Sequence, residues 1–194
     1  RAESAQRLRQ GVDRATHTVH QLLALARSGA DALDMAQREH ELVALVSDRV
    51  VLASPMALSR QIELELQAPE ECWLRVNRES VGALIDNLVD NAIKYTPAGG
   101  KVDVLLLDEG AGQVRLRLED SGPGIPPAER ERVFDRFYRV PGATESAPGT
   151  GLGLPIVRAV AQRHGATVRL DDSPLGGLRV EVRFPVPEGG AAGP

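Results

Sequence analysis

The chain has 194 residues, of which 42% are hydrophobic, and a formal net charge of −4 at pH 7, values typical of a globular protein with one core. Interspersed charges and only three Phe, two Tyr and one Trp argue against a nucleic-acid surface, and a single Cys72 excludes an internal disulfide framework or a multi-cysteine metal site. No uninterrupted apolar run approaches a bilayer-spanning length, so we expect no membrane contact by these residues.

The first predicted element is a helix over residues 5–26. Gly11 inside it costs about 1 kcal/mol relative to Ala, so we expect the helix to depend on a partner. The following residues, 28–38, predict a linker because they contain Gly29 and Asp31. Small and apolar residues of the helix recur in alternating steps of three and four, which is typical of a coiled-coil seam: Ala5, Leu8, Val12, Ala15, Val19, Leu22 and Ala26.

A second amphipathic helix and two strands are predicted next. The helix uses Leu42, Leu45, Val46 and Val50, and we expect it to end near Ser54-Pro55. Residues 62–66 alternate apolar and polar side chains, which predicts a half-buried strand, and residues 72–76 predict another. Cys72 lies in an apolar stretch and is interpreted as a packing residue.

The helix predicted over residues 78–95 has two different faces. Val81, Leu84, Ile85, Leu88, Ala92 and Tyr95 form an apolar face. Asn87, Asn91 and Lys94 follow the spacing i, i+4, i+7 and form a polar stripe beside it. Two asparagines on one line are equally compatible with solvated surface. A carboxamide oxygen is also a suitable neutral ligand for a Mg²⁺ whose charge is matched by phosphates, so the stripe is a candidate nucleotide site.

A hairpin of two strands is predicted over residues 101–108 and 113–120. In the second strand, apolar side chains alternate to one face and Asp120 continues this inward set. A buried carboxylate needs hydrogen-bond donors. Asp120 either caps the turn that follows it or binds the exocyclic amine of adenine. Gly122 and Gly124 favour adenine, because they permit a close backbone approach to a planar group.

A glycine run at residues 149–154 is predicted to open a helix that ends near His164. Amides at a helix N-terminus bind phosphate, and His164 is interpreted as interacting only with the C-terminal end of the helix dipole. The run alone is a weak signal. No strand precedes Gly149, as a dinucleotide site requires, and no Gly-Lys-Ser/Thr follows, as a P-loop requires.

The remaining segments complete the predicted order of elements. Residues 126–132 predict a short helical turn, and the two aromatics in VFDRFYR, residues 133–139, are interpreted as anchors. Residues 140–148 predict a mobile loop, since they are rich in Pro, Gly, Ala, Ser and Thr without periodicity. Residues 167–170 and 178–184 predict two further strands, and residues 186–194 a disordered tail.

Together these motifs resemble the catalytic ATP-binding domain of sensor histidine kinases, in the superfamily shared with gyrase, the mismatch-repair ATPases and the large heat-shock chaperones. NLVDN at 87–91 with Lys94-Tyr95 resembles the N box, and DSGPGI at 120–125 the first glycine box. VFDRFYR resembles the F box, and GTGLGLPIV at 149–157 the second glycine box. Four motifs in order are specific, and the F box separates kinases from the other ATPases. The resemblance covers about residues 39–187.

The resemblance implies an α+β fold, a two-layer sandwich of a mixed sheet with helices on one face, preceded by a long coiled-coil-type helix. It implies that Asn91 ligates Mg²⁺ with Asn87 close by, and that Asp120 binds adenine. Catalysis would use Asn91, Lys94 and Arg139. The other residues that it assigns to ATP are Tyr95, Gly122, Gly124, Ile125, Gly149, Thr150, Gly151, Leu152, Gly153 and Leu154.

Residues 1–27 resemble the second helix of the family's dimerisation and phosphotransfer hairpin, which implies a homodimer through this helix. The chain departs from the family because the first helix, with the phosphoacceptor His in a His-Glu-x-x-x-Pro setting, is missing. His40-Glu41 imitates the start of that box, but Leu45 stands where Pro is required. The start without an initiator Met or signal peptide is interpreted as that of a cut fragment. We therefore expect residues 39–187 to be a catalytic domain, flanked by the linker and a tail at 188–194.

The function expected is donation of the ATP γ-phosphate to a histidine elsewhere, for relay to a response-regulator aspartate, in the cytoplasmic portion of an inner-membrane sensor. One alternative is an ATP-driven conformational clamp of the same superfamily. A clamp needs a downstream domain that supplies a catalytic Lys, and only about ten residues follow the last strand. Another alternative is a module that binds nucleotide without chemistry, which the intact motifs do not favour.

Overall fold

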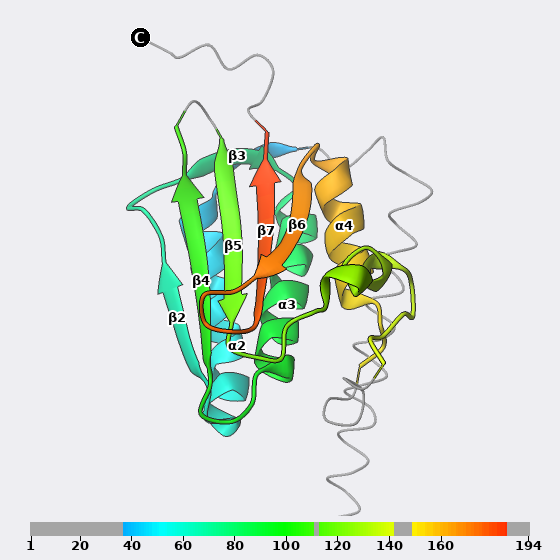
Figure 1. The fold of residues 1–194 in the computed structure, drawn as a ribbon. Coiled ribbons are helices and arrows are strands. Elements are labelled where there is room, and N and C mark those ends of the chain that lie inside the picture. The colour runs from blue at the N-terminus through cyan, green and yellow to red at the C-terminus, as the bar shows by residue number, and fades with distance from the viewer. Residues whose placement is uncertain (1–36, 111–112, 142–148, 186–194) are drawn as a thin grey trace, which may run out of the picture.

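The computed structural model describes residues 37–110, 113–141 and 149–185, which form a two-layer α+β sandwich (Figure 1). A five-stranded sheet of order β2-β4-β5-β7-β6 is covered on one face by helices. Only β2 and β4 pair in parallel. The strands are β2 (Glu63–Gln67), β4 (Lys101–Asp108), β5 (Val114–Asp120), β6 (Thr167–Asp172) and β7 (Leu178–Phe184), and the helices are α2 (Leu42–Ser59), α3 (Arg78–Tyr95) and α4 (Gly153–Arg163).

The expected fold class and most expected elements are confirmed. Helix α3 and strands β4, β5, β6 and β7 lie within two residues of their predicted bounds. The predicted helical turn at 126–132 is a pair of short 3-10 turns, η1 (Pro127–Glu129) and η2 (Arg132–Phe134). The predicted helix at 5–26, the linker up to residue 36, the loop residues 142–148 and the tail from residue 186 lie outside the described residues.

The core lies between the sheet and the helices, and α3 runs through its centre. Leu84, Ile85 and Ile93 of α3 have 0% of their surface exposed. The strands meet them with the alternating residues Val102, Val104, Leu106, Val114, Leu116, Leu118, Val180, Val182 and Phe184. Truncating such a buried Leu or Ile to Ala costs about 2–5 kcal/mol, so the face of α3 next to the polar stripe is fixed by packing.

Helix α2 is longer than predicted, because it continues through Pro55 to Ser59. Pro55 has no N–H for the carbonyl of Val51, but both residues are exposed, so water can hydrate that carbonyl. By length and composition α2 could cross a bilayer, contrary to the expectation from uninterrupted runs. Its buried residues, Leu42, Leu45, Val46, Val50 and Ala57, pack into the core as expected of a helix in a globular domain.

A second, two-stranded sheet begins the described chain and was not predicted as such. Strand β1 (Arg38–Glu41) pairs antiparallel with β3 (Trp73–Val76), so Arg38, assigned to the linker, is the first residue of a strand. Glu41 explains this arrangement. Its carboxylate caps α2 by accepting the N–H of Val43 at 2.8 Å, and it also accepts the N–H of Cys72 at 3.2 Å. The buried Cys72 is a packing residue, as interpreted.

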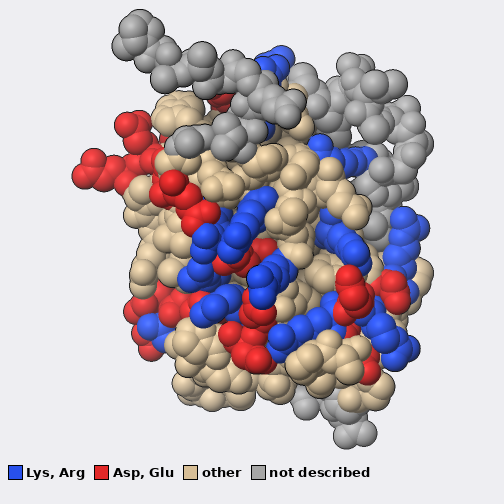
Figure 2. All heavy atoms as spheres, turned by 45° about the horizontal axis from the view of Figure 1, so that its top comes forward, with Lys and Arg blue, Asp and Glu red and all other residues tan. Residues whose placement is uncertain are grey.

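The outer face of the sheet carries an interleaved set of charges (Figure 2). Glu181 is buried and accepts hydrogen bonds from Arg117 at 3.1 Å and Arg183 at 2.7 Å. Burial alone would raise the pKa of Glu181, but the hydrogen bonds from Arg183 and Arg117 lower it. Glu119, also buried, pairs with Arg179 at 2.7 Å. Ion pairs across the strands therefore satisfy the buried carboxylates on the face of the sheet opposite the described helices.

His164 has a more specific role than an interaction with the dipole of α4. Its Nε2 accepts the backbone N–H of Asn77, the N-cap of α3, at 3.1 Å, and its Nδ1 lies 2.9 Å from the carbonyl of Val160. The ring also packs edge-on against Phe184. Burial lowers the pKa of His164, although the hydrogen bond to Val160 opposes this. A neutral imidazole therefore joins the end of α4 to the start of α3.

Protonation of His164 should destabilise the fold, because Nε2 would then become a second donor facing the N–H of Asn77. The folded-state pKa lies below the ordinary value of 6.5, so His164 allows full stability above that pH and reduces stability as the pH falls below it. We expect the midpoint of thermal unfolding to fall between pH 7.5 and 5.5, and His164→Gln to flatten this dependence. His40→Gln, on the edge strand β1, is the control that should retain it. Equal pH dependence in wild type and His164→Gln would contradict this role.

Candidate functional site

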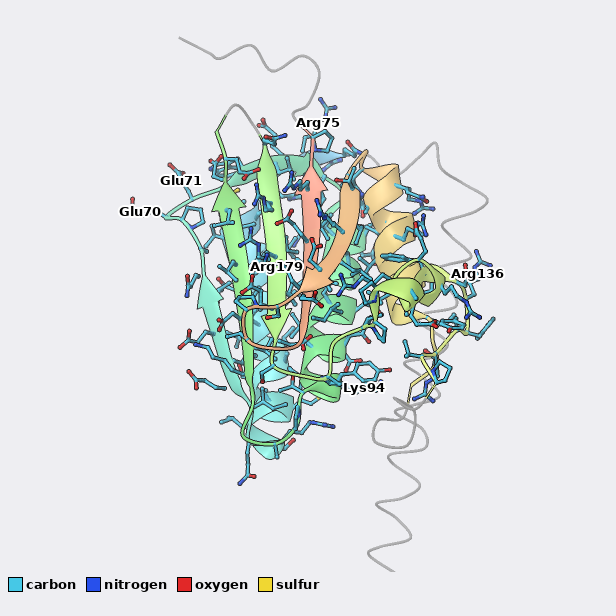
Figure 3. The ribbon with its side chains drawn as sticks, in the orientation of Figure 1. Glu70, Glu71, Arg75, Lys94, Arg136 and Arg179 are labelled. Atoms are coloured by element: carbon cyan, nitrogen blue, oxygen red, sulfur yellow. The ribbon has the colours of Figure 1, made fainter. Side chains whose placement is uncertain are left out.

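The polar stripe of α3 is partly buried and is not simply solvated surface. Asn87 is 7% exposed, and its amide donates to the carbonyl of Ala83 at 2.7 Å. Lys94 lies at the C-terminal end of α3 (Figure 3), where its Nζ is 3.7 Å from a carboxylate oxygen of Asp90. Asn91, between them on the stripe, is half-buried. The stripe therefore runs along the border of the core, with Asn87 inside it and Asn91 and Lys94 partly accessible to a ligand.

The glycine run at 149–154 packs directly against this stripe. A methyl group on Gly153 would lie 2.7 Å from Nδ2 of Asn91, closer than such atoms approach. A methyl group on Gly149 would lie 3.4 Å from the hydroxyl of Tyr95 and 3.7 Å from Nζ of Lys94. The N box and the second glycine box therefore form one surface, and a side chain at 153 would displace the carboxamide of Asn91.

The N-terminus of α4 presents backbone amides at this surface. Helix α4 begins at Gly153, and among the described residues no side chain caps it. Pro155 has no N–H, and the first helical hydrogen bond runs from Ile156 to Leu152. The amides of Gly153 and Leu154 are therefore those available to an anion at the positive end of the helix.

The side chains within the run differ in their roles. Leu152 has 0% of its surface exposed, and Leu154 packs against the core, so these two residues can line a phosphate site only through their backbone. Thr150 is half-buried. Gly151 has φ +70°, and its carbonyl accepts the N–H of Phe137 at 3.0 Å.

Asp120 is the buried carboxylate at the end of β5. It is 7% exposed, and among the described residues its two hydrogen bonds both end on Oδ1, from the N–H of Gly122 at 2.8 Å and of Leu178 at 3.1 Å. Burial raises the pKa of Asp120, and the two backbone hydrogen bonds oppose that rise. Asp120 therefore does cap the next turn, and this leaves Oδ2 for a second donor such as an exocyclic amine.

The turn after Asp120 is packed tightly against α3. A methyl group on Gly122 would lie 2.8 Å from the carbonyl of Tyr95. Gly124 has φ +69°, a conformation that favours glycine, and a methyl group there would lie 3.2 Å from the carbonyl of Gly177. Ile125 is half-buried against the core, and its carbonyl accepts Nε of Arg130 at 3.0 Å. These contacts place the first glycine box beside the end of the N box.

Sequence reasoning missed Gly177, which lies between the strands predicted at residues 167–170 and 178–184. Its N–H donates to the carbonyl of Asp120 at 3.1 Å. A methyl group on Gly177 would overlap Oδ1 of Asp120 and would lie 2.5 Å from the amide nitrogen of Gly122. The contact depends on the pairing of β5 with β7, residues about sixty positions apart, so no local signal could have revealed it.

The F box lies between the two glycine boxes and is held by cation–π contacts. The guanidinium of Arg132 lies 4.3 Å from the ring centre of Tyr138, and that of Arg158 lies 4.9 Å from the ring centre of Phe134. The hydroxyl of Tyr138 hydrogen-bonds to Glu129. Arg139 follows this cluster in sequence and is half-buried. The chain after it, at residues 142–148, lies outside the described residues. Its assigned role in catalysis stays a prediction.

A family model described as histidine kinase-, DNA gyrase B-, and HSP90-like ATPase matches residues 60–188, which include all four motifs and more than half of the chain. The chain belongs to this ATPase family. Within the family it is the catalytic ATP-binding domain of a sensor histidine kinase, since its relatives carry that name.

Two curated relatives and two solved structures illustrate the likeness. The swarming motility regulation sensor protein RssA of Serratia marcescens is 34% identical over 173 residues, which are 87% of this chain and 36% of RssA. The sensor protein kinase PmrB of Pseudomonas aeruginosa is 36% identical over 181 residues, 90% of this chain and 36% of PmrB. The chain thus spans little more than a third of these relatives.

The mycobacterial sensor histidine kinase MprB has a TM-score of 0.66 and 33% identity, over 77% of this chain and 97% of that structure. Full-length ShkA in complex with AMPPNP has a TM-score of 0.79 and 27% identity, over 92% of this chain and 37% of that structure. The fold of this ATPase domain is therefore that of histidine kinase catalytic domains.

The ATPase site offers a metal ion few protein ligands. Among the described residues there is no group of three or more His, Cys, Asp or Glu positioned to hold a metal. The carboxamide of Asn91 lies against Gly153, at the uncapped end of α4. One neutral oxygen ligand beside a phosphate site fits Mg²⁺ that arrives with nucleotide phosphates, since Mg²⁺ keeps few protein ligands.

Gly177→Ala should damage this ATPase site through Asp120. The added methyl group displaces the carboxylate, and overpacking of this kind costs about 1–3 kcal/mol of stability. We expect the affinity for AMPPNP, measured by calorimetry, to fall by about tenfold or more. Leu175→Ala, in the same turn, is the matched control and should bind normally. A folded Gly177→Ala protein with unchanged affinity would show that the position of Asp120 does not matter to nucleotide binding.

Proposed function

We propose that the domain binds Mg-ATP with adenine on Asp120 and the phosphates at the N-terminus of α4, and donates the γ-phosphoryl group to a histidine outside the catalytic domain. The observation that carries this proposal is the contact between Asn91 of the N box and Gly153, the first residue of α4. It brings an amide oxygen suited to Mg²⁺ and anion-binding backbone amides to one place. Gly122, two residues after the buried carboxylate of Asp120, packs against Tyr95 at the end of the same helix.

The adenine end of the proposed site is selective because its acceptor is buried and fixed. Oδ1 of Asp120 is held by two backbone donors, which orients Oδ2. An exocyclic amine that donates to Oδ2 would satisfy the carboxylate, whereas a carbonyl at the same position would face it as a second acceptor. The site should therefore prefer adenine to guanine. Gly122, Gly124 and Ile125 would shape the pocket around the base.

At the phosphate end, the chain supplies positioning and charge. The amides of Gly153 and Leu154 would donate to phosphate oxygens, and Lys94 would exchange its contact with Asp90 for one with a phosphate. Tyr95, whose hydroxyl lies beside Gly149, would contact the phosphates from the same side. Mg²⁺, when bound through Asn91 with Asn87 nearby, would neutralise the charge on the phosphates. Phosphoryl transfer depends mostly on such positioning.

Several features favour a kinase over a clamp or a module without chemistry. The F box is present and folded around Phe134 and Tyr138, and the relatives PmrB and MprB are named as sensor kinases. The related ShkA was solved with AMPPNP, an ATP analogue, which supports nucleotide binding at this fold. Both glycine boxes and the N box are in contact, which supports a working site rather than a degenerate one.

The whole protein would then be a two-component sensor kinase. We infer that residues 1–27 contribute to a dimerisation and phosphotransfer region, residues 28–38 to a linker and residues 39–187 to the catalytic domain, with a tail at 188–194. The partners would be a cognate response regulator, whose aspartate receives the phosphoryl group, and a second copy of the chain. The likeness to sensor protein kinases such as PmrB supports a cytoplasmic catalytic portion of a membrane-anchored protein.

Asp120→Asn should weaken binding of AMPPNP by roughly ten- to a hundredfold. A hydrogen bond to a charged group contributes about 1.5–3 kcal/mol, and an Asn that places its NH₂ at the Oδ2 position would oppose the amine. Glu119→Gln, the neighbouring buried carboxylate on the opposite face of β5, is the matched control and should bind normally in the same calorimetric titration. If both variants bind as the wild type does, the adenine assignment is wrong.

The catalytic domain should not phosphorylate its own described histidines. His40 is fixed in β1 opposite Leu74, and His164 is engaged with Asn77, so neither can align with a γ-phosphate. Incubation with radiolabelled ATP should leave the chain unlabelled. A hybrid in which a family phosphoacceptor hairpin replaces residues 1–27 should become labelled on that hairpin, and Asn91→Ala should abolish the label.

Two results would contradict this assignment. One is an acid-labile phosphate on the unmodified chain that disappears in His40→Gln. The other is a hybrid that binds ATP with normal affinity but never transfers the label, which would favour a module without chemistry.

A further inference from the structure

Helix α2 exposes an apolar stripe on the side that faces away from the core. Val51 is 67% exposed and Leu58 is 75% exposed, and Leu52 beside them is 70% exposed. Among the described residues, these are three of the five large hydrophobic side chains that are exposed, so the exposed apolar surface is concentrated on one helix. A stripe of this kind, several turns long, is a candidate interaction site.

The spacing of the stripe is that of a coiled-coil seam. The outward residues of α2 follow steps of four and three, Ala44, Asp48, Val51, Pro55 and Leu58, and all five are exposed. This period places them on one line along the helix. The one charged member, Asp48, is paired with Arg78 of α3 at 3.3 Å. The stripe therefore fits a second helix that carries an apolar seam of the same period.

The stripe is too small to hold a separate molecule by itself. Fifteen residues of helix from 44 to 58 give a length of about 22 Å, and with a width of about 10 Å the footprint is roughly 220 Å². A stable interface needs about 800 Å² from each partner. A tethered segment needs far less contact, because a short linker gives it an effective concentration in the millimolar range.

We propose that the stripe of α2 is the docking site for residues 5–26 of the same chain. Their apolar residues, Leu8, Val12, Val19 and Leu22 among them, follow the same alternating steps of three and four. The described chain begins at Gln37, and β1 leads from there directly to α2 at Leu42. The ten residues 27–36 span at most about 35 Å, so they can bring the seam to a stripe about 22 Å long.

Docking has a consequence for assembly. Residues 5–26 have one apolar seam. When this seam covers α2, it cannot also pack in a dimerisation hairpin or against a second copy of the chain. Association through residues 5–26 and docking on α2 are therefore mutually exclusive states of one segment. The proposal does not depend on nucleotide chemistry.

The accessibility of a cysteine placed on the stripe tests the proposal. In the full chain, Val51→Cys should react with iodoacetamide at least about tenfold more slowly than Glu70→Cys, an exposed loop position that serves as the control. The native Cys72 adds little background, because it is buried and burial raises its pKa to about 11. Adding Val12→Glu and Val19→Glu should raise the rate at Val51→Cys to that of the control, while AMPPNP affinity is unchanged.

Four outcomes would overturn the proposal. Equal rates at Val51→Cys and Glu70→Cys would show that the stripe is bare. Protection that persists in the Val12→Glu, Val19→Glu protein and grows with protein concentration would assign the stripe to a second copy of α2. Protection of Val51→Cys that is lost in the Val12→Glu, Val19→Glu protein but also falls on dilution would show that residues 5–26 of another chain cover the stripe. Protection that arises only with phosphatidylglycerol vesicles would assign the stripe to a bilayer surface. Circular dichroism of each variant confirms that it is folded.

Discussion

The site depends on a buried carboxylate that joins the end of β5 and the turn after it to the start of β7. Asp120 ends β5, caps the glycine turn through Gly122, and accepts the N–H of Leu178 at the start of β7. Its backbone carbonyl accepts the N–H of Gly177. A carboxylate with one oxygen occupied by fixed donors is costly to bury unless the other oxygen also gains a donor. In the proposed function, the exocyclic amine of adenine would be the donor to this second oxygen.

The phosphate end depends on close packing of two helices. Helix α3 presents Asn91 and Lys94 along one line. Gly153, the first residue of α4, lies against Asn91, and Gly149, in the loop before α4, lies near Lys94. The absence of a side chain at Gly153 permits this close approach, so the positive end of α4 and the polar stripe share one surface. The proposed adenine and phosphate contacts therefore come from different parts of the chain, which the sheet and the packing of α3 against α4 hold in a fixed relation.

Sequence patterns predicted the elements whose signals are local. The two-residue period of β5 predicted that Asp120 points inward, and the helical period of α3 predicted the stripe beside its apolar face; the structure confirms both. Burial of Asn87 and the contact of Gly153 with Asn91 then favour a site over solvated surface. The assignments of individual residues to ATP and Mg²⁺ stay predictions.

What the patterns could not predict depends on contacts between distant residues. Helix α2 continues past Pro55 because the affected carbonyl faces water, a fact that is visible only once the buried side is known. His164 binds Asn77, 87 positions away, and Gly177 contacts Asp120 only because β5 pairs with β7. Strand β1 forms because Glu41 can reach both α2 and Cys72. None of these partners can be inferred from spacing along the chain.

The most direct test of the account is a crystal structure of the chain with Mg²⁺ and AMPPNP. The account predicts the adenine amine at hydrogen-bond distance, about 2.8–3.1 Å, from Oδ2 of Asp120. It also predicts phosphate oxygens at the amides of Gly153 and Leu154, with Mg²⁺ on the carboxamide oxygen of Asn91. A nucleotide bound elsewhere, or bound here with its base away from Asp120, would contradict it.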